Sequence, residues 1–455
     1  MQKIHVHSSA QSAEDRADAG KVSKSEYLRP SRLAITAAAL AAGLLVQTQG
    51  FTQVPTSPSP GASTANHSGT TSDPEKEARK TWHAVMRNIP LPGTGCFHAR
   101  YPNVAWESAK CEESKPDAHP MAVNRTVGAP AAGNGTDYVA QAQGLISAAY
   151  GKFFISGVMN ETNVKTSLTT NPHPITGSNE YSLQLNTNNL CGSTTPANEC
   201  TLGTYIHTAA CGDYADCFVW QQFIYATDYD CTPYGSHCGN AGLFMQYWLY
   251  NWVGNCPHGW NTVNPTVNNG EQLSCWHNSR IQPVPNIPVT NLGDVILAGN
   301  AENGGNDEVA LEYGDDSWAV SNTDNSAPCC KGGLDIASVW NQAEFNVVGD
   351  ADLTDAQFNV GAQVIVLLEL YDGSQSAPTC PKNVGTTGET NNLTLGACQT
   401  GVSNPIYWYG CNNSSLNICT GFEISGPYIE FSESNPYVCL ACGPVVPGPP
   451  PPIEE

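Results

Sequence analysis

Glu344 lies in a segment where every second side chain is polar. Residues 341–350 read NQAEFNVVGD. In a β-strand this alternation places Gln342, Glu344 and Asn346 on one face and the apolar residues between them on the other. A carboxylate among amides is partly removed from water, which raises its pKa. Glu344 is therefore a candidate general base or acid for mildly acidic solution.

Two further segments carry amides at every second position. The segment YSLQLN places Gln184 and Asn186 opposite two leucines, and the segment LFMQYWLY places Gln246 on the side of Trp248 and Tyr250. A face that only meets water usually carries Lys, Glu, Thr and Arg instead. Amides and flat rings suit the recognition of sugars or of extended peptides, so the pattern predicts a binding groove.

Three segments of the chain together resemble a known family. Residues 341–350 are similar to the Ala-Glu-Trp strand that carries the catalytic glutamate of the eqolisins, the glutamic peptidases. Residues 219–225 (VWQQFIY) resemble the earlier strand with the catalytic glutamine, and residues 244–250 (FMQYWLY) resemble the aromatic strand that follows it. The resemblance covers residues 180–372. It implies a double-sheet β-sandwich that cleaves peptide bonds without a metal, a cofactor or a covalent intermediate.

The resemblance also implies roles for single residues. Glu344 would activate water and then protonate the leaving amine, while a glutamine would orient the water and stabilise the oxyanion through its amide N–H. Gln221 and Gln222 are both candidates for this glutamine and point to opposite faces. Alignment with the family pattern favours Gln221, whereas a face shared with Trp220 favours Gln222. The substrate-binding candidates are Trp220, Gln246, Trp248, Tyr250, Gln184 and Asn346.

The chain departs from the family pattern in three places. It has Phe345 where tryptophan is usual, 18 cysteines, and a long insertion at 256–288 between the aromatic and glutamate segments. These departures bear on catalysis more than on the fold.

Between about residues 150 and 435, alternating or β-branched runs are separated by clusters of Gly, Asn, Pro and Asp. Spaced strands with few helical spacers predict an all-β, antiparallel double-sheet β-sandwich of the jelly-roll or concanavalin-like kind. A short N-terminal helix is expected at 74–86, with Asp73 as N-cap and Pro74 at its first position. A second helix is expected at 138–150, between Asp137 and Gly151.

The N-terminal region and the cysteines indicate export. Residues 33–46 (LAITAAALAAGLLV) form an uncharged apolar run after several basic residues, which is typical of a secretory signal, with an uncleaved anchor as the alternative. The even number of cysteines predicts disulfides, and five pairs are close in sequence. These pairs are Cys96–Cys111, Cys231–Cys238, Cys256–Cys275, Cys380–Cys398 and Cys411–Cys419.

These features divide the chain into four parts. Residues 1–50 are expected to be a signal peptide or anchor, 51–130 a Ser/Thr/Pro-rich linker or propeptide-like extension, 131–435 the β-sandwich, and 436–455 a proline-rich tail. The protein is therefore expected to be secreted, with membrane attachment only through an uncleaved anchor.

Composition excludes several classes of function. With 19 Lys and Arg against 41 Asp and Glu, the net charge is −22 and nucleic acid is not an expected partner. The sequence has no G-x-S-x-G, no H-E-x-x-H and no phosphate-binding loop, so no metal or cofactor is expected. The first hypothesis is a secreted, acid-acting glutamic endopeptidase with a polypeptide substrate. The alternative is a secreted β-sandwich that binds polysaccharides or surfaces without catalysis.

Overall fold

The computed structural model describes thirteen stretches of the chain, and all statements below concern these residues. They are residues 74–113, 137–166, 176–187, 208–212, 217–229, 239–263, 272–322, 334–350, 354–382, 389–402, 407–409, 420–422 and 426–436. The apolar run at 33–46, the expected pairs Cys231–Cys238 and Cys411–Cys419, and all but the first residue of the C-terminal tail lie outside them.

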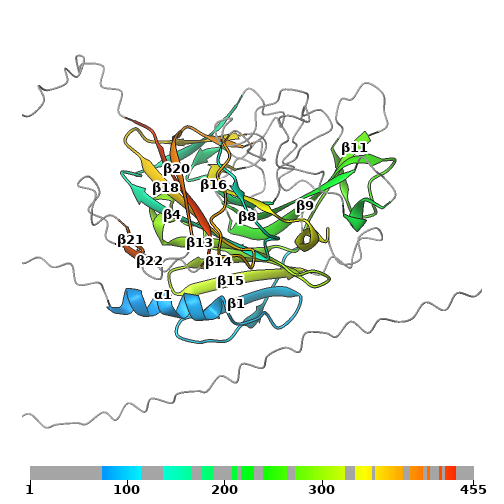
Figure 1. Cartoon of the computed structure of the whole chain (residues 1–455), viewed down its shortest axis with the longest axis horizontal. Helices are drawn as coiled ribbons and strands as arrows, with labels where there is room; N and C mark the ends of the chain where they lie inside the picture. The colour runs from blue at the N-terminus through cyan, green and yellow to red at the C-terminus, as the bar shows by residue number, and fades with distance from the viewer. Residues whose placement is uncertain are drawn as a thin grey trace, which may run out of the picture. The chain divides into compact units, whose positions relative to one another are not determined.

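The fold is an antiparallel β-sandwich, as the alternation of the sequence predicts (Figure 1). A nine-stranded sheet has the order β2-β1-β15-β14-β13-β4-β18-β23-β20. Its strands are β1 (Gly95–Arg100), β2 (Glu107–Ala109), β4 (Ala148–Ser156), β13 (Val295–Ala301), β14 (Asp307–Tyr313), β15 (Asp316–Asn322), β18 (Gln363–Tyr371), β20 (Thr394–Gly401) and β23 (Tyr428–Ser434).

An eight-stranded sheet carries the residues that the sequence marks as chemical. Its order is β10-β11-β9-β8-β7-β16-β3, and β12 also pairs with β9. Its strands are β3 (Ala140–Gln141), β7 (Tyr181–Asn186), β8 (Phe218–Ala226), β9 (Ala241–Val253), β10 (Asn261–Val263), β11 (Gln272–Asn278), β12 (Gln282–Val284) and β16 (Gln342–Gly349).

Smaller elements complete the fold. A four-stranded sheet contains β5 (Glu161–Lys165), β6 (Gly177–Ser178), β17 (Thr354–Phe358) and β19 (Thr390–Asn391), and a two-stranded sheet contains β21 (Tyr407–Tyr409) and β22 (Thr420–Phe422). Three short 3-10 helices lie at Ala209–Cys211, Val289–Asp294 and Ile336–Ser338. No helix among the described residues is long and apolar enough to cross a membrane.

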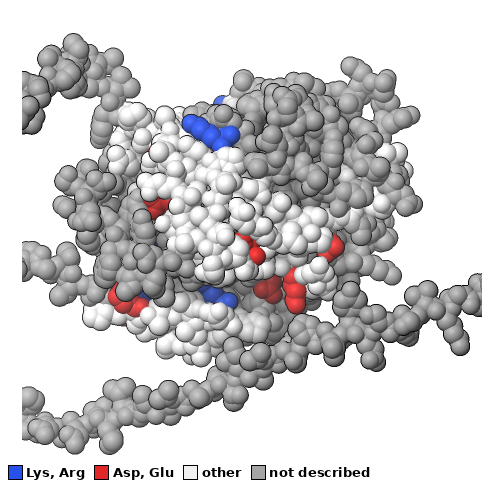
Figure 2. Space-filling model, viewed as in Figure 1, with Lys and Arg blue, Asp and Glu red and all other residues white. Residues whose placement is uncertain are grey.

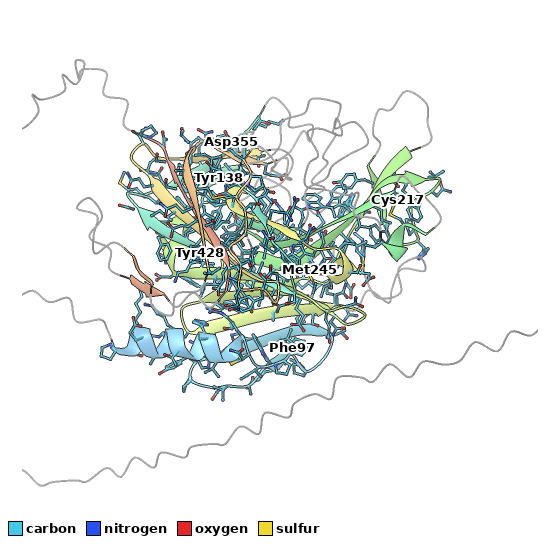
Figure 3. All side chains as sticks on the ribbon, in the orientation of Figure 1. Phe97, Tyr138, Cys217, Met245, Asp355 and Tyr428 are labelled. Carbon is cyan, nitrogen blue, oxygen red and sulfur yellow. A yellow bond between two sulfur atoms is a disulfide. The ribbon has the colours of Figure 1, made fainter. Side chains whose placement is uncertain are left out.

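One apolar core fills the space between the two large sheets. Strands β8 and β9 contact β13, β14 and β15 across this space. In β16 the buried Phe345 and Val347 belong to the core, whereas Glu344 and Asn346, which alternate with them, point to the other face. Met245 of β9 also lies in this core and is labelled in Figure 3. The period-2 alternation therefore separates an inner apolar face from an outer polar one, as predicted.

The N-terminal helix α1 (Pro74–Met86) has the bounds that the sequence predicts. It packs on the face of the nine-stranded sheet that points away from the core (Figure 1). There the His83 ring Nδ1 lies 3.0 Å from the Ser317 hydroxyl. Strand β1 pairs with β15, and β2 pairs with β1. The nine-stranded sheet therefore contains strands that precede residue 131. The boundary expected at 131 is therefore too late, because GCFHAR pairs as a strand and a disulfide joins Cys96 to Cys111.

The helix expected at 138–150 does not form. Its residues enter β3 and the start of β4, which pair with β16, β13 and β18. Sheet pairing overrides the helical propensity of the alanines here. Gly151, expected as the end of that helix, lies inside β4, where a Cβ atom would overlap the ring of Phe345. Its lack of a side chain lets the two sheets approach.

Four disulfides join described cysteines. Cys96–Cys111, Cys256–Cys275 and Cys380–Cys398 match three of the expected pairs, and Cys211–Cys217 is a fourth that sequence proximity did not single out. Several disulfides in one chain are typical of extracytoplasmic proteins. Charged side chains are scattered over a mostly uncharged surface on the side shown in Figure 2.

Candidate active site

Five polar residues form one transverse row across the outer face of the eight-stranded sheet. In the strand register Glu344 of β16 lies opposite Asn186 of β7, which lies opposite Gln222 of β8. Gln222 lies opposite Gln246 of β9, which lies opposite Asn278 of β11. Directly opposed residues in antiparallel strands share a face. The structure therefore brings the expected glutamate and one expected glutamine to the same side of the sheet.

Hydrogen bonds connect the side chains at the Glu344 end of this row. Asn186 Nδ2 donates to Glu344 Oε2 at 3.4 Å, and Gln222 Nε2 donates to Asn186 Oδ1 at 3.0 Å. Gln222 Nε2 also donates to Gln184 Oε1 at 3.1 Å. A primary amide has two N–H donors, so both donors of Gln222 are engaged. Asn186 therefore lies between the Glu344 carboxylate and the Gln222 amide. The sequence predicted a water molecule, oriented by the glutamine, in this position.

Gln221 points to the opposite face. It is buried in the core side of the sheet, with its Nε2 4.0 Å from the Sδ of Met245. Its backbone N–H donates to Thr187 Oγ1 at 3.1 Å. Of the two glutamines that the sequence left open, Gln222 lies on the face of Glu344 and on the side of Trp220.

Aromatic residues on the same face form a second apolar cluster beside the row. Trp248 and Tyr250 are stacked, with ring centroids 5.4 Å apart and 10° between their planes. Trp220 lies 6.3 Å from Trp248, and Trp248 Nε1 donates to Gln246 Oε1 at 2.8 Å. The predicted aromatic and amide candidates therefore do lie together.

These candidates are buried rather than open to solvent. Glu344 is 1% exposed, Gln222 and Trp248 are 0% exposed, and Tyr250, the most exposed of the predicted site residues, reaches 6%. The sequence predicted an open groove on this face, and in this respect the expectation was wrong. The alternation fixes which side chains share a face, but it carries no information on what packs over that face.

Two carboxyls that the sequence did not single out as site residues contact Asn346, two residues after Glu344 on the same face. Asn346 Nδ2 donates to Asp137 Oδ2 at 2.8 Å and to Glu433 Oε1 at 3.0 Å. Burial, and then the charges of Glu344 and Glu433, raise the pKa of Asp137 well above its usual range. Burial also raises the pKa of Glu433 to about 7, although hydrogen bonds from Asn346 and Asn391 oppose this rise.

A sequence signal for Glu433 existed. In the segment YIEFSES it shares a face with Ile429 and Phe431, and an acid in line with core residues is unusual. Asp137 instead matched the pattern of a helix N-cap. Because a helix was expected at 138–150, Asp137 was not considered as a site residue.

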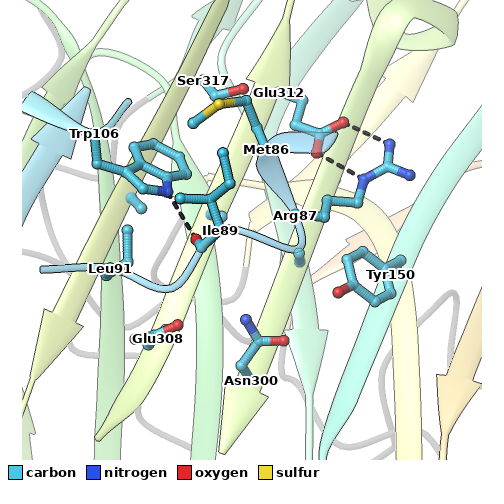
Figure 4. A pocket seen from close by; sticks show the side chains of 13 residues that line it. Met86, Arg87, Ile89, Leu91, Trp106, Tyr150, Asn300, Glu308, Glu312 and Ser317 are labelled. Carbon is cyan, nitrogen blue, oxygen red and sulfur yellow. Dashed lines mark hydrogen bonds and ion pairs between the residues drawn. The ribbon is translucent and has the colours of Figure 1, made fainter. Parts of the chain in front are cut away.

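A small cavity lies elsewhere, under the segment that follows α1 (Figure 4). It is lined by Arg87, Trp106, Tyr150 and Glu308, among others, and has a volume of about 40 Å³. Binding sites for small molecules usually have several hundred Å³. This cavity therefore does not compete with the Glu344 row as a candidate active site.

No group of three or more His, Cys, Asp or Glu side chains within the described ranges is arranged to hold a metal ion. Comparison of the chain with protein-family models, with curated proteins and with solved structures finds no match. The eqolisin resemblance consequently rests on the three short segments.

Proposed function

We propose that this protein is a secreted, acid-acting endopeptidase in which Glu344 is the general base. The observation that carries the proposal is the row itself: Glu344 shares the outer face and a hydrogen-bonded path with Gln222, two strands away. The order of the segments along the chain, glutamine before aromatic before glutamate, supports the same assignment.

The proposed chemistry is hydrolysis by one carboxylate. Glu344 takes a proton from water, and the hydroxide equivalent attacks the carbonyl carbon of the scissile peptide bond. The tetrahedral intermediate carries the negative charge on the former carbonyl oxygen. Glu344 then returns the proton to the nitrogen as the C–N bond breaks. One water is consumed, and a carboxylic acid and an amine are released.

The oxyanion needs a hydrogen-bond donor, and two residues of β8 are the candidates. Both N–H groups of Gln222 are engaged with Gln184 and Asn186, so Gln222 can donate only after giving up one of these bonds. The indole N–H of Trp220, two residues earlier on the same face, has no acceptor in the described part of the chain. We therefore assign the donor role to Trp220, with Gln222 aligning Asn186 and offering its carbonyl oxygen to the attacking water.

Action in acid agrees with the buried carboxyls of the fold. The pKa values of Asp137, Glu161, Glu180 and Glu433 are all raised, with burial as the largest cause in each case. Neutral acids tolerate burial better than carboxylates do, so a medium that keeps these carboxyls protonated favours the folded state.

In the carbohydrate-binding alternative the ligand would bind the same face, but the acidic residues on that face would not take part. A sugar would stack on Trp220, Trp248 or Tyr250, whereas the three carboxyls around Asn346 would have no role in that binding. Both functions require that the buried face open to a ligand. The carboxyl chemistry beside the amide row favours the peptidase.

The test is proteolysis of a denatured protein at acid pH by wild type and by Glu344→Gln. The variant keeps the size of the side chain and removes the base, so we expect cleavage to be lost while the circular dichroism spectrum is unchanged. Glu308→Gln, a glutamate of β14 on the other sheet, is the matched control and should stay active. Undiminished cleavage by Glu344→Gln would refute the assignment. No cleavage by wild type, together with retention on a polysaccharide column, would support the alternative.

A further inference from the structure

Asp137 is a buried acid held by defined donors at the edge of the eight-stranded sheet. It comes three residues before β3 and is 1% exposed. Its Oδ1 accepts the backbone N–H of Tyr138 at 2.7 Å, and its Oδ2 accepts Asn346 Nδ2 at 2.8 Å. Tyr138, the next residue, is labelled in Figure 3. A carboxyl with both oxygens engaged has a fixed orientation.

The orientation of Asn346 is fixed as well. Its Oδ1 accepts the backbone N–H of Val347 at 2.8 Å, so its amide nitrogen faces Asp137 and Glu433. Asn391 in turn donates to the carbonyl oxygen of Val347 at 2.9 Å and to Glu433 Oε2 at 3.4 Å. Asn346 therefore holds two acids in place two residues along the same face from Glu344.

Three acids from three elements surround this part of the face: Asp137 and Glu433 both accept from Asn346, and Glu344 lies two residues before Asn346 on the same strand face. Glu344 comes from β16, Glu433 from β23, and Asp137 precedes β3. One exposed cation, Lys382, pairs with Tyr138, and its Nζ lies 5.7 Å from the centre of the Tyr138 ring. Two adjacent carboxyls in a buried site do not both ionise readily, because the two negative charges repel each other with little water to screen them. One proton must therefore stay in the group when Glu344 is ionised.

We propose that Asp137 is the second carboxyl of the Glu344 site: Asp137 keeps its proton while Glu344 is ionised, and Asn346 holds Asp137 in place. This inference rests on the proposed function, in which Glu344 must be a carboxylate before it can take a proton from water. Asp137 is a positioning residue, since it acts through Glu344 and not on the substrate.

The direct test follows the proton by infrared spectroscopy on the full chain. A carboxylic acid absorbs at a C=O frequency distinct from that of a carboxylate, and Asp137→Asn identifies the band of Asp137 by difference. We expect this band to be present at pH 5. In Glu344→Gln the like charge is gone, so the band should titrate about one pH unit or more lower. Glu433→Gln should give a smaller shift in the same direction, and Glu308→Gln should give none.

Activity at acid pH supplies the second readout. Asp137→Asn has the shape and the neutral charge of the protonated acid, but its amide nitrogen cannot accept a hydrogen bond as an Asp137 oxygen does. It should therefore lose less kcat/KM at pH 4 than Asp137→Ala, which leaves one N–H of Asn346 without its acceptor and should lose at least tenfold. Absence of the Asp137 band at pH 5, or a titration of this band that does not change in Glu344→Gln, would overturn the proposal. The infrared result does not depend on cleavage, so failure of the peptidase proposal alone remains distinguishable.

Discussion

The Nδ2 of Asn186 lies 3.4 Å from the Oε2 of Glu344, directly across the register of β7 and β16. Asn186 bridges Glu344 and Gln222, since its Oδ1 accepts from Gln222 Nε2. The alternation of residues 181–186 predicts that Asn186 lies on this face, but Asn186 is not among the predicted site residues. Its position makes it the most direct probe of the row.

Asn186→Asp keeps the acceptor for Gln222 and replaces the donor to Glu344 by a second acid. In acid the new carboxyl can stay protonated and donate as the amide did. As the pH rises, two carboxylates meet in a buried site, so the free energy of unfolding should fall more steeply than in wild type. Thermal unfolding at several pH values measures this slope. Asn278→Asp, at the other end of the row opposite the amide of Gln246, is the control. Equal slopes in the two variants would contradict the bridge.

Gln221 and Gln222 should respond in opposite ways to the same substitution. Gln221→Met removes a buried carbonyl oxygen that has no hydrogen-bond partner in the described structure, so it should be neutral or stabilise by about 1 kcal/mol. Gln222→Met strips Asn186 and Gln184 of their donor and should cost about 1–3 kcal/mol. Urea unfolding followed by tryptophan fluorescence compares the two. Equal changes in the free energy of unfolding would contradict the assignment of the two glutamines to different faces. Proteolysis should fall only in Gln222→Met.

The sequence predicted the sheet faces better than the site. Alternation in β7, β8, β9 and β16 correctly separated Glu344, Asn346 and Gln246 from the apolar core, because the period of a strand is set by covalent geometry alone. It could not show that β7 lies between β8 and β16, since strand order depends on long-range pairing. Burial of the row and its contacts with Asp137 and Glu433 come from segments distant in sequence, which no local pattern encodes.

Stability should be highest in acid and fall as the pH rises. Burial raises the pKa of Glu161 to about 9, helped by the charge of Glu180. It also raises the pKa of Glu180 to about 9, helped by Asp228. An unfolded glutamate titrates near pH 4.3, so between about pH 4 and 9 the folded state binds more protons than the unfolded state. The contribution is complete below this window and is lost on passing up through it.

Glu161→Gln and Glu180→Gln test this dependence, because a neutral amide has no charge to bury. Free energies of unfolding in urea, measured across this pH range, should decline less in either variant than in wild type. Glu75→Gln, on the exposed side of α1, controls for a general change in charge and should follow wild type. If the free energy of unfolding of the wild type stays constant from pH 4 to pH 9, the raised pKa values of Glu161 and Glu180 are ruled out.

One of the ion pairs that join α1 and the residue after it to the nine-stranded sheet is buried and gives stability with the opposite pH dependence. Just after the helix, Arg87 Nε and Nη2 donate to the two carboxylate oxygens of Glu312 at 2.7 and 2.6 Å (Figure 4). Burial alone would raise the pKa of Glu312, but the charge and hydrogen bonds of Arg87 lower it overall. A depressed folded pKa gives stability that is present above the unfolded value and is lost as the pH falls through the folded one.

Arg87→Met should therefore destabilise the protein by about 3–5 kcal/mol at pH 7, where it leaves a buried carboxylate without its partner. The loss should shrink in acid, where Glu312 takes up a proton, and it should also shrink when Glu312→Leu is added to Arg87→Met. Unfolding in urea at pH 7 and pH 4 measures all three variants. Lys76→Ala removes the exposed pair with Asp294 and should change stability by less than about 1 kcal/mol. If Arg87→Met costs as little as Lys76→Ala at pH 7, the pair does not hold the helix, and apolar contacts of Trp82 and Met86 must do so instead.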